Sequence, residues 1–234
     1  MIRLGLPSKG RLMEKTFYWF GERGLSLSRT GAEREYSVAA EAEGLEVALI
    51  SAADMPGELA AGRIHLGVTG SDLVREGLAD WEQQVAEVAP MGFGHADLVI
   101  AVPACWADVG TLDDLDAAAA AFRRVHGFRL RIATKYHRLV REFLREAGVA
   151  DYQLVDSQGA TEGAVKNLAA EAIADITSTG ETLRANHLKI LPDGLIHQSQ
   201  ATLFMSRKAA WEDEDRAALS SLLKRLGIAE PDRI

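Results

Sequence analysis

Short apolar segments alternate with longer amphipathic segments along the whole chain. Residues 2–6 alternate between leucine or isoleucine and a polar or small residue, which predicts a strand. A turn at 7–11 follows, and apolar residues then recur near helical spacing over 12–20. The same order of strand, turn and helix returns up to an amphipathic helix expected at 213–226. Strands that alternate with helices are typical of an α/β protein with a parallel or mostly parallel sheet.

Two lobes are expected within this arrangement. The chain has 234 residues, which suits one large domain or two lobes of about 100 residues each. An apolar strand at 97–102 ends at Pro103 and is the candidate crossing into the second lobe. We expect lobe I at 1–95 plus 190–234, and lobe II at 96–189. The other expected elements are strands at 45–50, 64–68, 85–89, 129–133 and 152–155, a polar hairpin or extended excursion at 29–46, and a helix at 112–125.

Four of the expected strands end in polar turns that begin helices. Their sequences are PSKGR, TGSD, ATKY and TSTGET, at 7–11, 69–72, 133–136 and 177–182. In α/β folds, ligands gather beyond the carboxyl ends of the strands. We therefore expect these turns to converge on one cleft between the lobes, where several donor-rich turns suit two phosphate-bearing substrates.

The most informative turn lies in DITSTGETL, at 175–183, which follows the small apolar run 172–174. Hydroxyl side chains and Gly180 stand where a helix begins, and backbone N–H groups at a helix start bind anions. Threonine and serine also cap helices without any ligand, and capping is the favoured explanation for such a loop taken alone. Asp175 changes this balance, because a carboxylate just before a phosphate loop can accept hydrogen bonds from sugar hydroxyls. Loop and acid together predict a ribose phosphate site.

The charge of the chain restricts the classes of ligand. Its formal net charge is −8, so broad electrostatic binding to nucleic acid or to an anionic membrane is not expected. A phosphate must then be held by local donors. Lys9 and Arg11 lie in the first polar turn, where they either face an anion or are simply solvated. Asp72, in the second turn, either caps its helix or meets the amino edge of a base.

The compartment is expected to be the cytoplasm. The single Cys105 cannot form an internal disulfide, and its place in the apolar run 98–106 predicts an inert core thiol in a reducing compartment. That run is too short to span a bilayer, which takes about 20 residues. The N-terminal sequence contains no apolar signal core.

Several motifs, in this order and spacing, resemble the catalytic subunit of the ATP phosphoribosyltransferase family, the first enzyme of histidine biosynthesis. They are KGRL at 9–12, LGVTGSDL at 66–73, RIATKY at 131–136, GATEG at 159–163, DITSTGETLRANHLKIL at 175–191 and SQA at 199–201. The resemblance covers nearly the whole chain. It implies two lobes like those of type II periplasmic binding proteins, with 5-phosphoribosyl 1-pyrophosphate and ATP in the cleft. The implied reaction is inverting attack by adenine N1 of ATP on the anomeric ribose carbon, with loss of pyrophosphate assisted by Mg²⁺.

The resemblance also implies roles for single residues. Donor binding is implied for Asp175 at the ribose hydroxyls, for Thr177, Ser178, Thr179, Gly180, Glu181 and Thr182 at the 5-phosphate, and for Glu162. ATP binding is implied for Lys9, Arg11, Asp72 and Lys135, the last near the ribose or the phosphates, and the catalytic group is Asp175, Lys9 and Arg11. Many family members carry an arginine where this chain has Ser51; Arg34 or Arg29 is expected to replace it, and the sequence leaves open which.

The chain ends soon after the last expected helix, so it resembles the short form of the family, which lacks a histidine-binding regulatory domain. This form is expected to be a homodimer that assembles with a regulatory subunit resembling histidyl-tRNA synthetase. The sequence does not reveal which residues bind Mg²⁺, and the metal is expected to ride mainly on pyrophosphate oxygens and water. Two other functions stay open from the sequence: a cytosolic two-lobed sensor without catalysis, and a phosphoribosyltransferase for another base.

Overall fold

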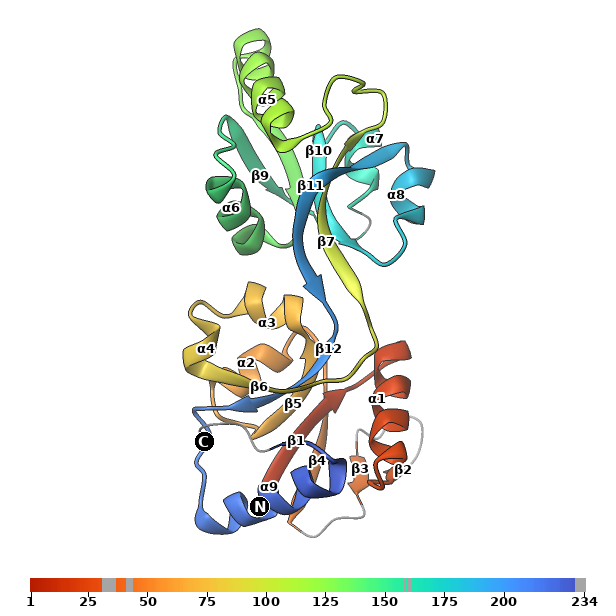
Figure 1. The fold of residues 1–234 in the computed structure, drawn as a ribbon, viewed down its shortest axis with the longest axis vertical. Coiled ribbons are helices and arrows are strands. Elements are labelled where there is room, and N and C mark those ends of the chain that lie inside the picture. The colour runs from red at the N-terminus through yellow and green to blue at the C-terminus, as the bar shows by residue number, and fades with distance from the viewer. Residues whose placement is uncertain (31–36, 41–43, 158, 160, 230–234) are drawn as a thin grey trace. The chain divides into compact units, whose positions relative to one another are not determined.

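The chain forms two compact units in a computed structural model that describes residues 1–30, 37–40, 44–157, 159 and 161–229 (Figure 1). The first unit comprises Met1–Gly94 and Gln200–Ile234, and the second comprises His95–Ser199. The first crossing adjoins the expected residue 95. The second lies after Ser199 rather than before residue 190, because strand β11 (Leu188–Ser199) pairs along its length with β7 (Ala96–Pro103) of the second unit.

The first unit is built on a seven-stranded sheet in the order β2-β3-β4-β1-β5-β12-β6. At its centre β1 pairs in parallel with β4 and β5, while the flanking pairs are antiparallel. The elements of this unit are β1 (Ile2–Pro7), α1 (Gly10–Glu22), β2 (Leu27–Thr30), β3 (Ser37–Ala40), β4 (Leu45–Ile50), α2 (Met55–Ala60), β5 (Leu66–Gly70), α3 (Ser71–Gly77), α4 (Trp81–Gln84), β6 (Val85–Pro90), β12 (Ala201–Ser206) and α9 (Asp213–Leu226).

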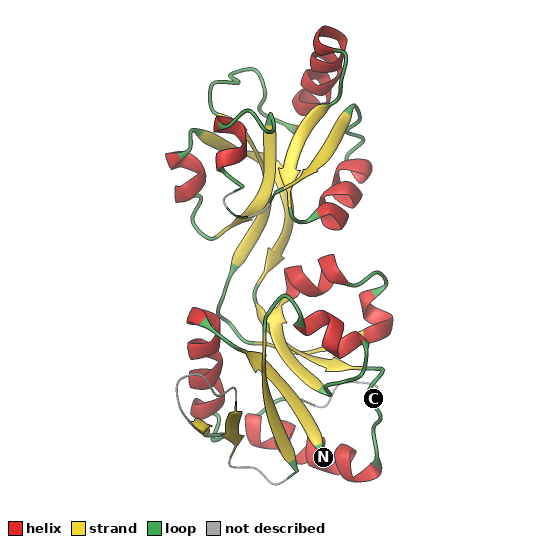
Figure 2. Ribbon diagram, turned by 180° about the vertical axis from the view of Figure 1, so that it is seen from behind, coloured by secondary structure: helices red, strands yellow, loops and turns green. Residues whose placement is uncertain are grey.

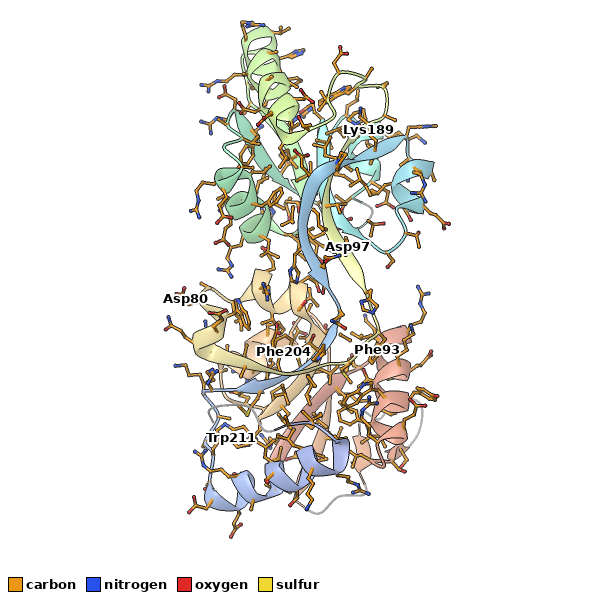
Figure 3. The ribbon with its side chains drawn as sticks, in the orientation of Figure 1. Asp80, Phe93, Asp97, Lys189, Phe204 and Trp211 are labelled. Carbon is orange, nitrogen blue, oxygen red and sulfur yellow. The ribbon has the colours of Figure 1, made fainter. Side chains whose placement is uncertain are left out.

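Helices cover both faces of this first sheet. On one face α1 and α9 pack on β1 and β5 in a cluster that contains Phe20 and Leu223. On the other face α2 and α3 pack around Phe204 of β12, which is labelled in Figure 3. Gly5 allows α2 to approach closely, since a Cβ atom there would lie 2.6 Å from the Met55 sulfur. This close packing fixes the segment 51–54, which joins β4 to α2, at the carboxyl ends of the strands.

The second unit is built on a five-stranded sheet in the order β11-β7-β10-β8-β9. The strands β10, β8 and β9 are parallel, and β7 pairs antiparallel with both β10 and β11. Figures 1 and 2 show α5 and α6 on one side of this sheet and α7 and α8 on the other. The remaining elements of this unit are α5 (Leu112–His126), β8 (Leu130–Thr134), α6 (His137–Glu146), β9 (Tyr152–Asp156), α7 (Gly163–Lys166), β10 (Ala172–Thr177) and α8 (Glu181–Ala185).

Local sequence signals account for the ends of the longest helix. Thr111 Oγ1 accepts a hydrogen bond from the Asp114 amide, and the Asp114 carboxylate accepts one from the Thr111 amide, which forms a capping box at the start of α5. At the other end Gly127 has a φ of +81°, the left-handed conformation that ends helices. The helix predicted at 112–125 is observed as α5, and the one predicted at 213–226 is observed as α9, so both predictions are confirmed.

The predicted two-lobed α/β architecture is confirmed, with parallel pairing among β4, β1 and β5 in the first sheet and among β10, β8 and β9 in the second. The antiparallel pairs involve β7 and β11 in the second sheet, β12 and β6 in the first, and the consecutive strands β2, β3 and β4. The polar excursion at 29–46 contributes the hairpin pair β2 and β3 in its described part. The expectation of a buried thiol is wrong, since Cys105 is exposed in the turn after β7.

Candidate active site

Three parallel strands of the second unit have their carboxyl ends along the same side of its sheet. The register aligns Thr134, at the end of β8, with Asp156, at the end of β9. β10 ends at Thr177, which pairs with Asp97 at the start of β7; Figure 3 labels Asp97. We call this the second-unit edge, made of residues 95–97, 134–137, 161–162 and 175–182.

Hydroxyl groups shape the loop 177–182. Thr177 Oγ1 accepts a hydrogen bond from the Gly180 amide at 2.8 Å, and Thr179 Oγ1 accepts one from the Glu181 amide at 3.3 Å. These two threonines thus stabilise the turn ahead of α8, whose N-cap residue is Gly180 and receives no side-chain cap. Gly180 has a φ of +71°, a conformation that L side chains rarely adopt, so the glycine is required by the turn itself.

Other donors of this loop remain available to a ligand. Among the described residues, no group accepts a hydrogen bond from the backbone amides of Ser178, Thr179 and Thr182, and all three residues are exposed. Ser178 Oγ donates to the carbonyl oxygen of His95 at 2.9 Å, which ties the loop to the residue before β7. Nearby amides without acceptors can form an anion-binding concavity. The loop can therefore bind an anion without changing its own hydrogen bonds.

A carboxylate and an ammonium group stand just beside the loop. The Asp175 side chain, on β10, is 13% exposed, and its Oδ1 lies 4.0 Å from Lys135 Nζ. The same oxygen accepts a hydrogen bond from the Ile176 amide at 2.9 Å. Lys135 follows β8, and its Nζ lies 5.3 Å from the centre of the Tyr136 ring. The pair presents a charged acceptor and a cation at the same edge, which suits a molecule carrying both hydroxyl and phosphate groups.

Buried hydroxyl groups hold the neighbouring turns in place. Thr134 is fully buried, and its Oγ1 accepts a hydrogen bond from the Tyr136 amide at 2.9 Å. After β9, Ser157 Oγ donates to Oγ1 of the fully buried Thr161 at 2.7 Å. Glu162 follows as the half-buried residue before α7. The predicted acid at 162 is thereby fixed at the second-unit edge.

The first unit has its own edge of strand ends, formed where β4, β1 and β5 finish. The Ser8 amide donates to the Ile50 carbonyl oxygen at 2.9 Å, which extends the pairing of β1 and β4 by one residue. Lys9 and Arg11 are both exposed in the turn into α1. Neither cation has a carboxylate within 4 Å in the part of the chain that the structure describes. Both are available to an anionic ligand.

Asp72 lies at the same first-unit edge but is far less accessible. It is 6% exposed, in the first turn of α3. The adjacent Ser71 amide donates to the Gln200 carbonyl oxygen at 3.1 Å, and Gln200 Oε1 accepts a hydrogen bond from the Gly92 amide at 3.1 Å. The predicted base-side acid is therefore enclosed among the segments that flank β5 and β12.

The predicted residues divide between the two units. The second-unit edge holds Asp175, the loop, Glu162 and Lys135, so Lys135 lies with the group predicted to bind the phosphoribosyl donor. The first unit holds Lys9, Arg11 and Asp72, and half-buried Ser51 follows β4. Arg34 lies outside the described residues. No group of three or more His, Cys, Asp or Glu side chains arranged for a metal occurs in the described ranges. Of the helices described, none has the length and apolarity to cross a membrane.

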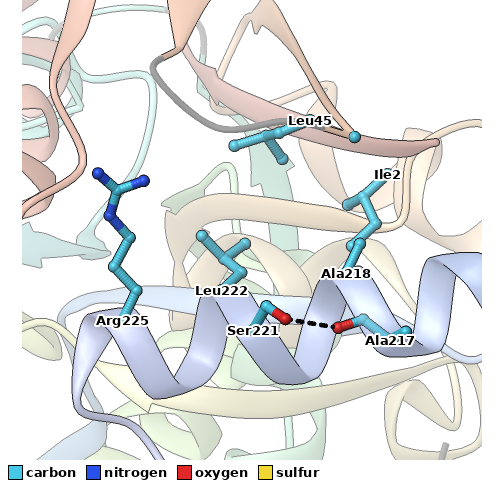
Figure 4. Close-up of a pocket in the computed structure, with 8 residues that line it drawn as sticks. Ile2, Leu45, Ala217, Ala218, Ser221, Leu222 and Arg225 are labelled. Atoms are coloured by element: carbon cyan, nitrogen blue, oxygen red, sulfur yellow. Dashed lines mark hydrogen bonds between the residues drawn. The ribbon is translucent and has the colours of Figure 1, made fainter.

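A separate pocket of about 420 Å³ lies at the opposite end of the first sheet. Ile2 and Leu45, at the starts of β1 and β4, line it together with Leu222 and Arg225 of α9 (Figure 4). It adjoins the beginnings of the parallel strands, whereas the candidate site lies at their ends. The pocket is therefore distinct from the candidate site.

Sequence reasoning missed one side chain at the second-unit edge. Arg184 Nη2, on α8, donates to the carbonyl oxygen of Thr179 at 3.0 Å. Its position one helical turn after Gly180 is the signal that could have indicated it, because side chains so spaced return to the same side of a helix.

The fold and the loop define an α/β protein of two units, with a loop of exposed backbone amides at the strand ends of the second. A histidine kinase sensor domain with similarity to periplasmic binding proteins has a TM-score of 0.52, at 13% identity over 97% of this chain and 89% of that one. The ATP phosphoribosyl transferase (HisG:HisZ) complex from Thermotoga maritima has a TM-score of 0.72, at 22% identity over 97% of both chains. Both likenesses concern the fold.

Sequence comparison is more specific. The family model of ATP phosphoribosyltransferase matches residues 51–227. A relative named ATP phosphoribosyltransferase, from Cereibacter sphaeroides, is 70% identical over 234 residues, which are 100% of this chain and 99% of the relative. The chain belongs to the ATP phosphoribosyltransferase family.

Proposed function

We propose that this chain transfers the phosphoribosyl group of 5-phosphoribosyl 1-pyrophosphate to N1 of ATP, giving phosphoribosyl-ATP and pyrophosphate. The observation that carries the proposal is the loop 177–182, with its exposed amides and with Asp175 directly ahead of it. Membership of a family named for this transfer supports the same conclusion.

The second-unit edge binds the phosphoribosyl donor. The amides of Ser178, Thr179 and Thr182 bind the 5-phosphate, since oriented N–H groups and short hydroxyl side chains suit its oxygens. Asp175 accepts hydrogen bonds from the ribose hydroxyls, and Lys135 attracts the phosphates at the same edge. Gly180 and Glu181 supply the turn, and Glu162 lies within the same set of strand ends.

The first-unit edge binds ATP. Lys9 and Arg11 are exposed cations that suit the nucleotide or pyrophosphate oxygens. Asp72 is the candidate acceptor for the amino group of adenine. At Ser51 the family resemblance implies an arginine, and Arg34 or Arg29 is the candidate to replace it.

Positioning and charge stabilisation account for the chemistry. Adenine N1 is unprotonated at neutral pH, so it attacks the anomeric carbon without a general base while the bond to pyrophosphate breaks with inversion. The protein then has to hold donor and acceptor and to stabilise charge on the leaving group. Lys9, Arg11 and Lys135 are the described cations suited to the latter task.

Magnesium enters as part of the pyrophosphate-bearing substrate. Mg²⁺ keeps several waters and binds proteins through one or two carboxylates together with phosphate oxygens. Asp175, with a 13% exposed side chain at the second-unit edge, is an oxygen donor that fits such a role. When bound, Mg²⁺ would supply neutralisation of charge on pyrophosphate, while the residues of this chain orient the donor.

The assembly in which the chain works is also a proposal. The Thermotoga maritima structure is a complex of two components, HisG and HisZ. We propose that this chain likewise works with a second component, as a homodimer that binds a regulatory subunit resembling histidyl-tRNA synthetase. We place the enzyme in the cytoplasm, where its phosphorylated substrates are made.

A direct assay tests the proposed transfer. The chain is incubated with ATP, the donor and Mg²⁺, with and without the regulatory subunit, while pyrophosphate is followed and the nucleotide product is identified by mass. We expect pyrophosphate release to require both substrates and the product to carry the mass of phosphoribosyl-ATP. Donor binding without any pyrophosphate release in either mixture would favour a sensor. Turnover with another purine or pyrimidine in place of ATP would point to a different acceptor.

A further inference from the structure

The side chain of Arg184 folds back over the loop 177–182. Its Nη2 donates to the Thr179 carbonyl oxygen at 3.0 Å, and its Nη1 lies 2.9 Å from the position that a Cβ atom on Gly180 would occupy. The guanidinium therefore covers the peptide that joins Thr179 to Gly180. In the described part of the chain, the Thr179 carbonyl is the one hydrogen-bond acceptor of this side chain.

The same peptide is held from its opposite side as well. A trans peptide is planar, so its carbonyl oxygen and its amide hydrogen point in opposite directions. The amide of this peptide is that of Gly180, which donates to Thr177 Oγ1 at 2.8 Å. Arg184 and Thr177 thus fix one peptide plane between them. Rotation of that plane would disturb the amides on either side of it.

Charge gives the contact a second effect. The Thr179 carbonyl oxygen carries partial negative charge within a loop that has to accept a phosphate. A cationic donor forms a stronger hydrogen bond to such an oxygen than a neutral one does. It also brings positive charge to a loop without Lys or Arg of its own, in a chain whose net charge is −8.

We propose that Arg184 is a positioning residue for the phosphoribosyl donor, which orients the loop 177–182 by holding the Thr179 carbonyl. This inference rests on the proposed function of the loop. A basic residue in the last turn of a helix often serves only to balance the helix dipole. Arg184 differs from that case, because its guanidinium bonds a carbonyl that precedes α8 instead of a carbonyl at its C-terminal end.

Donor affinity is the first readout. Binding of the Mg²⁺ complex of 5-phosphoribosyl 1-pyrophosphate is titrated by calorimetry to the wild type, Arg184→Gln and Arg184→Lys, and KM values are measured for both substrates. We expect Arg184→Gln to weaken donor binding and raise the donor KM about 10-fold, the effect of losing one hydrogen bond to a charged group. Arg184→Lys should recover part of this loss, and the KM for ATP should stay within about twofold.

Amide exchange of the unliganded chain separates action through the loop from direct contact with the donor. Arg184→Gln should speed hydrogen exchange of the Gly180 amide, since its peptide has lost one of two restraints. A residue that only touched the donor would leave exchange in the free protein unchanged. Arg145→Gln is the matched control, because Arg145 is an exposed arginine in the last turn of α6. It should alter neither donor affinity nor Gly180 exchange.

A double-variant cycle tests the contact itself. Gly180→Ala places a Cβ where the Arg184 guanidinium lies, so it should displace that group as well as strain the loop. Its penalty on donor affinity should therefore be smaller in an Arg184→Gln background than in the wild type. Additive penalties would contradict the contact.

Two outcomes would overturn the role of Arg184 alone, and a third would overturn the proposed function as well. Unchanged donor affinity in Arg184→Gln, or unchanged Gly180 exchange, would refute the role of Arg184. In that case the proposed function would still stand, provided that the wild-type chain binds the donor and turns over. A wild-type chain that bound no donor at all would overturn both.

Discussion

The carboxylate of Asp175 is the side chain on which the proposed chemistry depends most. Replacing it by asparagine keeps the size and the hydrogen bond from Ile176 but removes the charge that strengthens bonds from ribose hydroxyls. We expect Asp175→Asn to lower kcat/KM about 100-fold with a melting temperature close to that of the wild type. Steady-state kinetics and thermal unfolding measure the two effects. Asp108→Asn, at an exposed carboxylate of the same unit, should change neither.

The hydroxyl of Thr177 illustrates a side chain with a structural and a functional consequence. Its Oγ1 accepts the Gly180 amide, so Thr177→Val leaves that amide without its acceptor, whereas Thr177→Ser retains one. We expect the valine variant to raise the donor KM about 10-fold and the serine variant to stay near the wild type. Equal KM values for both variants, with ATP held at saturation, would show that this hydrogen bond does not hold the loop.

An ion pair between elements stabilises the sheet that carries the loop. Arg131 on β8 donates through its amide, at 2.8 Å, and through its guanidinium to Glu171, the residue before β10. Burial raises the pKa of Glu171, but the hydrogen bonds and charge of Arg131 outweigh it and hold the pKa below the ordinary value of 4.5. The pair therefore stabilises the folded chain above that value, and the contribution is lost as pH falls below it.

This linkage predicts that the difference in unfolding free energy between the wild type and Glu171→Gln depends on pH. At pH 7, Glu171→Gln should lower the free energy of unfolding by about 1 to 2 kcal/mol, because a partly buried charged hydrogen bond is replaced by a neutral one. The difference should close as pH falls below 4.5, where wild-type Glu171 becomes protonated. Urea denaturation at several pH values measures it. Glu142→Gln, exposed on α6, serves as the control, and a gap that persisted to low pH would exclude the linkage.

The packing of α2 on the first sheet depends on Gly5 and Gly67, which both face Met55. A Cβ on Gly5 would lie 2.6 Å from the Met55 sulfur and 2.8 Å from Ile64 Cδ1, inside a fully buried cluster. We expect Gly5→Ala to cost about 1 to 3 kcal/mol of unfolding free energy, the usual cost of overpacking a core. Gly57→Ala, in α2 itself, meets no atom within 4 Å and should be neutral or stabilising. Chemical denaturation distinguishes the two, and equal effects would contradict the close approach.

Much of this arrangement could be predicted from the chain, because apolar alternation marks strands and glycine or proline marks their ends. The polar turns after β1, β5, β8 and β10 were all placed at strand ends by that reasoning. The antiparallel partners were not, since β7, β11, β12 and β6 have the same apolar pattern whichever direction they run. The hydrogen bond from Arg184 to the Thr179 carbonyl oxygen could not be predicted either, because the sequence does not show where a long, flexible side chain folds back. The exposure of Cys105 depended on the exact end of β7, which an apolar run does not fix.

The division of the chain into two units leads to a prediction about the whole molecule. The second unit is one continuous segment, His95–Ser199, and its ends lie together because Ser199 pairs with Ala96 across β11 and β7. A segment with its own buried core and adjacent ends is a candidate for independent folding. Its core includes Ile173, Leu183 and Ala133.

A fragment of residues 95–199 should therefore fold alone and bind the phosphoribosyl donor but not ATP, because the loop and Asp175 lie within it while Lys9 and Arg11 do not. We expect cooperative thermal unfolding by circular dichroism, and calorimetric binding of the Mg²⁺ donor complex that Thr177→Val weakens about 10-fold. A fragment that folds cooperatively yet binds ATP in preference to the donor would reverse the assignment of the two edges. An unfolded fragment would show instead that the second unit needs the first for its stability. Binding of the donor and of ATP would then be measured on the full chain carrying Asp175→Asn or Lys9→Gln, and these measurements would decide which edge binds which substrate.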